Sequence, residues 1–64
     1  MNHVFWVEIM FDAKAGVWVI ADTDLPGLYI EADSEEAMRE RIKLLGPELI
    51  RLNAHTFEIL VNSK

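Results

Sequence analysis

The sequence predicts an α+β domain in which one helix covers one face of a four-stranded sheet, with the elements in the order β-β-β-α-β. Three observations support this prediction. Apolar residues alternate along residues 3–11 and 17–22, which is the pattern of a β-hairpin. A turn, a short apolar segment and a helix start then follow one another within residues 24–37. After a helical pattern, residues 55–62 alternate again and predict a last strand.

Length and composition restrict what the chain can be. Its 64 residues make one domain, 1–64, and a domain of this size buries only about 60% of its unfolded surface. Because there is no cysteine, disulfides and thiolate metal sites are excluded, and self-association or a protein partner is the expected source of further stability. No apolar run reaches the roughly 20 residues of a membrane helix and no signal peptide is recognisable, which predicts a cytoplasmic protein without membrane contact.

The predicted hairpin has a loop at residues 12–16, in which Gly16 can adopt a positive φ. If Phe11 lies opposite Val17, the odd positions form one continuous apolar face for the helix to cover. The even positions are mixed: they include Glu8 and Asp22 but also large apolar residues, although a face in contact with water normally alternates to polar residues. With one residue from each later strand, this face predicts an oligomer interface made of Trp6, Met10, Trp18, Ile20, Tyr29 and Leu60.

The second half of the hairpin leads into a turn at residues 23–27. Pro26 fixes φ and Gly27 tolerates a positive φ, which favours a type II turn. Residues 28–31 are predicted to form the short third strand. The last strand, 55–62, should place Phe57, Ile59 and Val61 on the face that the helix covers. The order of the strands within the sheet stays open.

The helix is predicted over about residues 34–45. Asp33 is a good N-cap with Glu36 three residues later, and Ser34 is a competing cap. Residues 46–47, Gly-Pro, should break the helix, because proline disfavours helical geometry at the residue before it and has no N–H to donate. One further helical turn is expected after this break.

Three segments together resemble a known family. They are the hairpin loop Phe11-Asp12-Ala13-Lys14-Ala15-Gly16-Val17-Trp18, the turn Asp24-Leu25-Pro26-Gly27, and the helix start Ala32-Asp33-Ser34-Glu35-Glu36-Ala37-Met38. Their order and spacing resemble the HicB-like antitoxin domain, closest to small stand-alone HicB-like members of unknown function. The resemblance implies a partly RNase-H-like fold and a partner of the HicA type, a small basic ribonuclease. Many such antitoxins carry a C-terminal DNA-binding segment, which we do not expect in this chain, so direct DNA binding is not expected either.

The acidic residues give the predicted partner-binding site. They cluster around the turn and the helix start, and an acidic surface there would steer a basic partner. The residues of this predicted acidic rim are Asp22, Asp24, Glu31, Asp33, Glu35 and Glu36. The alternative is that these acids are solvated loop residues and helix caps without a binding role. Glu8, Asp22 and Glu58 should share or border the apolar sheet face, and with a net charge of -5 this argues against direct nucleic-acid binding.

No catalytic or metal site is expected. Asp12, Asp22 and Asp24 are the carboxylates that could hold Mg²⁺, but Asp12 and Asp22 should lie at opposite ends of the hairpin, too far apart to share an ion. His3 and His55 lack a third ligand for zinc. The favoured hypothesis is a HicB-like interaction domain without cofactor, in a dimer or larger oligomer, that occludes a small basic toxin. The alternatives are a self-assembling domain without a toxin and a residual metal-dependent nuclease. A neighbouring reading frame for a small basic protein would favour the first.

Overall fold

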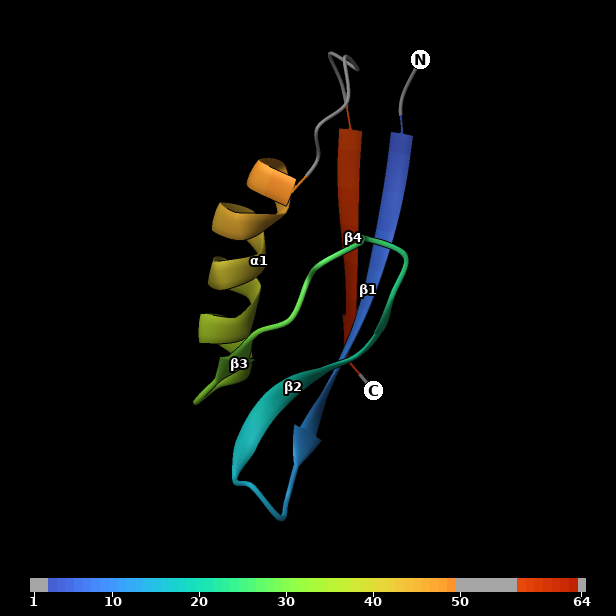
Figure 1. The fold of residues 1–64 in the computed structure, drawn as a ribbon. Helices are drawn as coiled ribbons and strands as arrows, with labels where there is room; N and C mark the ends of the chain where they lie inside the picture. Colours follow the sequence, from blue (N-terminus) through green and yellow to red (C-terminus); the bar gives the residue numbers. More distant parts are fainter. Residues whose placement is uncertain (1–2, 50–56, 64) are drawn as a thin grey trace.

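The computed structural model describes residues 3–49 and 57–63, and shows one helix packed against a four-stranded mixed sheet (Figure 1). The elements are β1 (His3–Asp12), β2 (Val17–Thr23), β3 (Glu31–Ala32), α1 (Glu35–Leu49) and β4 (Phe57–Ser63). This confirms the α+β class and the order β-β-β-α-β. The predicted strand residues His55 and Thr56, and the end of the further helical turn at residues 50–52, lie outside the described residues.

The sheet has the strand order β3-β2-β1-β4, so β1 is central and β4 forms an edge. β1 and β2 are an antiparallel hairpin, and β2 pairs with β3 in the same sense. The helix then carries the chain across the sheet, and β4 returns parallel to β1, from His3 opposite Phe57 to Ile9 opposite Ser63 (Figure 1). The odd residues of β4 therefore share the helix-covered face of β1, as predicted.

The hairpin register differs by one residue from the prediction, because β1 continues through Asp12. The Asp12 carboxylate accepts hydrogen bonds from the N–H groups of Lys14 (3.0 Å) and Ala15 (3.3 Å). Its carbonyl oxygen accepts one from the N–H of Gly16 (2.7 Å), whose φ of 72° confirms the expected positive φ. These bonds close the turn directly after Asp12, and Phe11 lies opposite Trp18 instead of Val17.

This shift turns residues 17–20 of β2 over, since a slip of one residue exchanges the two faces of a strand. Trp18 and Ile20 lie opposite Phe11 and Ile9 and pack against the core. The rings of Trp18 and Phe11 meet edge to face, with centroids 6.0 Å apart. The prediction that Trp18 and Ile20 belong to the uncovered face is therefore wrong. The pairing of β1 with β2 is irregular between Glu8 and Ile9, where Ala21 of β2 has no partner in the register.

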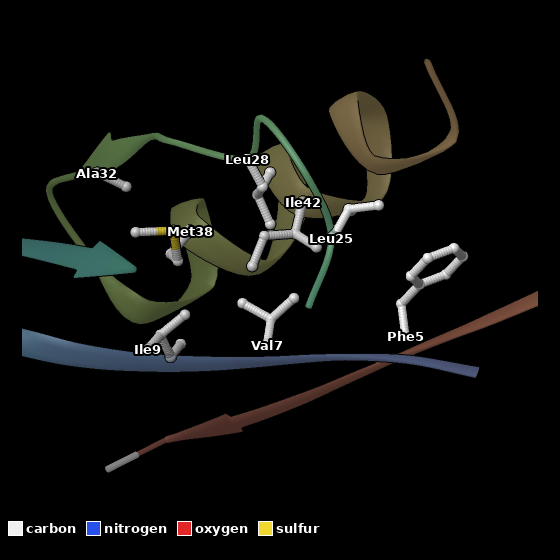
Figure 2. Close-up of a cluster of buried hydrophobic side chains, with 8 residues drawn as sticks. All are labelled: Phe5, Val7, Ile9, Leu25, Leu28, Ala32, Met38 and Ile42. Atoms are coloured by element: carbon white, nitrogen blue, oxygen red, sulfur yellow. The ribbon is translucent and has the colours of Figure 1, made fainter. Parts of the chain in front are cut away.

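The core lies between the helix-covered face of β1 and α1, closed by the turn after β2 (Figure 2). Figure 2 shows the β1 side chains of Phe5, Val7 and Ile9 pointing toward α1. Met38 and Ile42 of the helix face them, and Leu25 and Leu28 come from the segment after β2. Val7, Ile9 and Met38 are fully buried. The complete core cluster consists of Phe5, Val7, Ile9, Leu25, Leu28, Ala32, Met38 and Ile42.

The turn after β2 has the predicted form, but the third strand is shorter than predicted. The N–H of Leu28 donates to the carbonyl oxygen of Leu25 (3.4 Å), and Gly27 has a φ of 80°, as a type II turn requires. β3 contains only Glu31 and Ala32, because these two residues alone pair with β2. Tyr29, predicted to lie in this strand and in the oligomer interface, is in the connection before it and is 84% exposed.

The helix begins at Glu35 with Ser34 as its N-cap. The Ser34 hydroxyl oxygen accepts the N–H of Ala37 (3.0 Å), and its carbonyl oxygen accepts that of Met38 (3.0 Å). The prediction of Asp33 as the cap is wrong, because the hydroxyl one residue later reaches the free N–H of the first turn. The consequence is that Glu36 does not occupy the third helical position, and no capping box forms.

The predicted break at Gly46-Pro47 does not occur, and α1 continues to Leu49. Proline removes one helical hydrogen bond. Gly46, the residue before this proline, is buried against β4 and the turn after β2. A Cβ atom at this position would collide with the side chain of Ile59 and lie 3.9 Å from Leu25 Cδ2. Gly46 is thus a point where the helix lies close to the Ile59 side chain of β4.

Replacement of Gly46 by leucine should therefore destabilise the domain although leucine is the better helix former. A leucine side chain would have to displace Ile59 and Leu25. Overpacking of this kind costs about 1–3 kcal/mol, which a urea denaturation curve would show as a lower midpoint. Leu44→Ala on the same helix, at a side chain that is 69% exposed, is the control and should change the midpoint little. An unchanged midpoint for Gly46→Leu would show that the close approach is absent.

Candidate protein-interaction face

No described residue covers the face of the sheet that is turned away from α1. We call this face the open face. The pairing registers place its members side by side, since directly opposed residues share a face. Leu60 lies beside Trp6, Val19 beside Met10, and Asp22 beside Glu8. Together with Glu31 beside Val19 and Glu58 beside Val4, the open face includes Val4, Trp6, Glu8, Met10, Val19, Asp22, Glu31, Glu58 and Leu60.

The centre of the open face is apolar and exposed. Trp6 is 38% exposed, Met10 37%, Val4 47% and Leu60 50%. A solvated sheet face would carry polar residues at these positions, and an exposed apolar group of this kind marks an interaction surface. Trp6, Met10 and Leu60 lie where the alternation predicts them. Val19 was missed as a member, because only the one-residue shift of the hairpin brings it to this side.

The charged side chains of the open face are all acidic. Glu8, Asp22, Glu31 and Glu58 belong to it, while the residues of the four strands include no lysine or arginine. Lys14 lies in the hairpin loop, and the other described cations, Arg39, Arg41 and Lys43, lie on α1. The open face therefore combines an apolar centre with negative charge, which is complementary to a surface that is apolar and basic.

The predicted acidic rim is not one surface. Asp22 and Glu31 lie on the open face, at separate positions along β2 and β3. Asp33 and Glu36 are both exposed, beside the start of α1. The remaining two acids, Asp24 and Glu35, are held by hydrogen bonds within the fold, which assigns structural roles to them.

Asp24 extends the pairing of β2 with β1 beyond the last residue of β2. Its carboxylate accepts the backbone N–H of Trp6 (2.9 Å), and its own N–H donates to the Trp6 carbonyl oxygen (3.4 Å). The Thr23 hydroxyl donates to the same carbonyl oxygen (2.8 Å) and accepts the N–H of Leu25 (3.0 Å). These bonds fix the backbone of Trp6 and thereby the position of its side chain on the open face.

Replacement of Asp24 by alanine should lower the stability of the domain by about 1 kcal/mol, because the Trp6 N–H loses its acceptor. Asn is the matched control, since its amide oxygen can still accept that bond while the charge is lost. Urea denaturation of the two variants gives the comparison, with Asp24→Asn close to the wild type. Equal loss in both variants would mean that the charge, and not the hydrogen bond, is what matters.

Glu35 and Arg39 tie the helix to β4. Arg39 Nε lies 3.1 Å from Glu35 Oε2, and the two Nη groups donate to the Val61 carbonyl oxygen (3.2 Å) and to the Ser63 hydroxyl (3.3 Å). The pKa of the Glu35 carboxyl is lowered, first by a hydrogen bond from Ser63 and then by that from Arg39. Glu35 and Arg39 therefore connect α1 to the end of β4.

The lowered pKa of Glu35 predicts a pH dependence of stability. In the unfolded chain the carboxyl has its ordinary pKa of 4.5, so as the pH falls toward that value the unfolded state binds the proton more readily than the folded state. The contribution of Glu35 is present above this pH and is lost as the pH falls through the lowered folded-state pKa. Urea midpoints from pH 7 to pH 3 should converge between wild type and Glu35→Gln at low pH. Glu36→Gln controls for the lost charge, and a constant difference for Glu35→Gln would contradict the assignment.

The described residues contain no group of three or more histidine, aspartate or glutamate side chains that could hold a metal ion. Asp12 lies at the hairpin loop, and Asp22 lies opposite Glu8 farther along the strands. His55 is outside the described residues. Within the described part of the chain, no helix is long and apolar enough to cross a membrane.

The fold and the open face define the class of the protein: a small α+β domain with one helix-covered sheet face and one apolar, acidic face left open. Residues 4–63 match the family described as a domain of unknown function, DUF1902, and the chain belongs to this family of small HicB-like domains. The crystal structure of a hypothetical protein from the extremely thermophilic bacterium Thermus thermophilus is similar, with a TM-score of 0.80 and 28% sequence identity over 97% of this chain and 93% of that chain. No curated protein matches the chain.

Proposed function

We propose that the domain is a protein-interaction module that binds a small basic protein through its open face. One observation carries the proposal: the exposed centre of Trp6, Met10 and Leu60 is bordered by acids, and no strand contains a lysine or arginine. Trp and Met are typical of interface centres, while uniform negative charge selects a basic partner over an acidic one. The resemblance of the three sequence segments to HicB-like antitoxin domains favours the same class of function, while the matched family itself is described only as a domain of unknown function.

The mechanism is occlusion, without chemistry by the domain itself. The apolar centre would supply the binding energy as it is removed from water, and the acidic residues would accelerate association with a cationic surface. A partner of the HicA type, a small basic ribonuclease, fits these requirements, and the domain would then act as an antitoxin in the cytoplasm. Binding of this kind weakens with added salt, because exposed charges are screened.

The test begins with a pull-down of the tagged protein from an extract of its native cells. A small basic protein in equimolar amount is expected, and it is then purified and titrated calorimetrically against the domain at low and high salt. Binding that is tight at low salt and weaker at high salt supports the proposal. Recovery of the domain alone, or of a partner whose binding is independent of salt, would contradict it.

A further inference from the structure

The outer edge of β4, on the side away from β1, is free of any strand formed by the described residues. β1 pairs with one side of β4, and none of the described residues forms a strand on the other. Arg39 reaches the carbonyl oxygen of Val61 by its side chain, so this carbonyl points away from β1. Backbone groups alternate in direction along a strand, and those of Phe57, Ile59 and Ser63 therefore also point outward. Such a row of outward groups is a template for another strand.

Edge strands are normally protected by charges, prolines, bulges or short length. β4 has seven residues, of which Glu58 is charged and none is proline or glycine. Its ladder with β1 runs without irregularity from Phe57 to Ser63. A long, regular and weakly charged edge of this composition tends to pair with a further strand.

We propose that β4 pairs with β4 of a second copy of this chain, antiparallel about a two-fold axis at Leu60. In this register Leu60 meets Leu60 of the second copy, Glu58 meets Asn62, and Ile59 meets Val61. No like charges are opposed. The Val61 carbonyl oxygen has two lone pairs, so it can accept the N–H of the second copy while it keeps the bond from Arg39.

Repulsion between acidic side chains favours the β4 edge over the open face as the contact between two copies. Each chain carries a formal charge of -5, and two open faces in contact would bring Glu8, Asp22, Glu31 and Glu58 of both copies together. Along β4, Glu58 is the single charged side chain. An apolar hollow of about 400 Å³ between α1 and β4, lined in part by Phe57, Ile59 and Val61, also borders this edge and would be extended by the second copy.

Edge pairing leaves the open face uncovered. The two open faces then adjoin across the β4–β4 seam in one continuous sheet, with Leu60 of both copies at the centre. The dimer is thus compatible with binding of the proposed basic partner to the open face. Whether the dimer forms does not depend on that partner. The proposal concerns the purified chain alone, so it needs no ligand for its test.

Single cysteines test the seam, because the chain has none of its own. Residues directly opposed in a non-hydrogen-bonded pair have Cα atoms about 4.5 Å apart, which a disulfide can span. Under mild oxidation Leu60→Cys is expected to form a covalent dimer more than ~10-fold faster than Leu44→Cys on the helix, because pairing holds the thiols at a high effective concentration. Glu58→Cys and Asn62→Cys should cross-link when mixed.

Sedimentation of the unmodified wild type complements the cross-linking and should give the mass of two chains. The mixed pair Glu58→Cys and Asn62→Cys should give a disulfide between the two different variants. A wild type that sediments as a single chain at several hundred micromolar would overturn the proposal. So would Met10→Cys, on the open face, cross-linking as fast as Leu60→Cys, since that result would place the contact on the open face.

Discussion

Replacing Trp6 by alanine is expected to weaken binding of the basic partner by at least about 30-fold, while the domain stays folded. Buried tryptophans at the centre of interfaces commonly contribute about 2 kcal/mol or more when truncated, which corresponds to this factor. Trp6 is flanked by Leu60 of β4 on one side. On the other side, Asp24 and Thr23 make hydrogen bonds to the Trp6 backbone. Those bonds involve backbone atoms of residue 6, so they remain in the variant.

Calorimetric titration with the purified partner measures this effect. Leu44→Ala is the matched control, because Leu44 is a large apolar side chain, 69% exposed, on the helix and therefore away from the open face. Its affinity should equal that of the wild type. Urea midpoints of both variants show whether the fold is kept. Undiminished affinity of Trp6→Ala would remove the open face from the binding site.

Replacing Met38 by alanine is expected to destabilise the domain by about 2–5 kcal/mol. Met38 is fully buried between α1 and the β1 side chains Val7 and Ile9 (Figure 2). Alanine is the better helix former, so a loss of stability must come from the cavity and not from helix propensity. A chain of 64 residues has a total stability of only about 3–10 kcal/mol, and the variant is expected to be partly unfolded at 37 °C.

Thermal unfolding followed by circular dichroism gives the second measurement. Leu44→Ala again provides the control, since it makes a similar change on the same helix at an exposed position. The transition of Met38→Ala should move to markedly lower temperature, whereas that of Leu44→Ala should stay close to the wild type. Equal transitions for Met38→Ala and the wild type would contradict the packing of α1 onto β1.

The elements of the fold could be predicted from the sequence because each has a clear periodicity or turn signal. Alternation identified the strands, and the positive φ of Gly16 and Gly27 was expected from their places in the turns. The continuity of α1 could not be predicted, because Gly46-Pro47 suits a helix break as well as a close helix–strand contact. That Gly46 faces Ile59 depends on β4, which is distant in the sequence.

The open face could be predicted only in part, for a similar reason. Trp6, Met10 and Leu60 follow from the alternation within β1 and β4. Trp18 and Ile20 were assigned to the wrong face because the side-chain hydrogen bonds of Asp12, a local detail of one turn, set the register of the whole hairpin. The acids Asp24 and Glu35 gave no sequence signal for their hydrogen-bonded roles, since any acidic residue in a turn or first helical turn looks alike.

The central claim is that the open face binds the basic partner, and the two tryptophans test it directly, since one lies on each face of the sheet. Titration of the 15N-labelled domain with the partner would follow the two indole N–H resonances. We expect the Trp6 resonance, on the open face, to shift strongly while that of Trp18, packed against the core, changes little. A shift of Trp18 or of amides on α1 with an unchanged Trp6 resonance would contradict it.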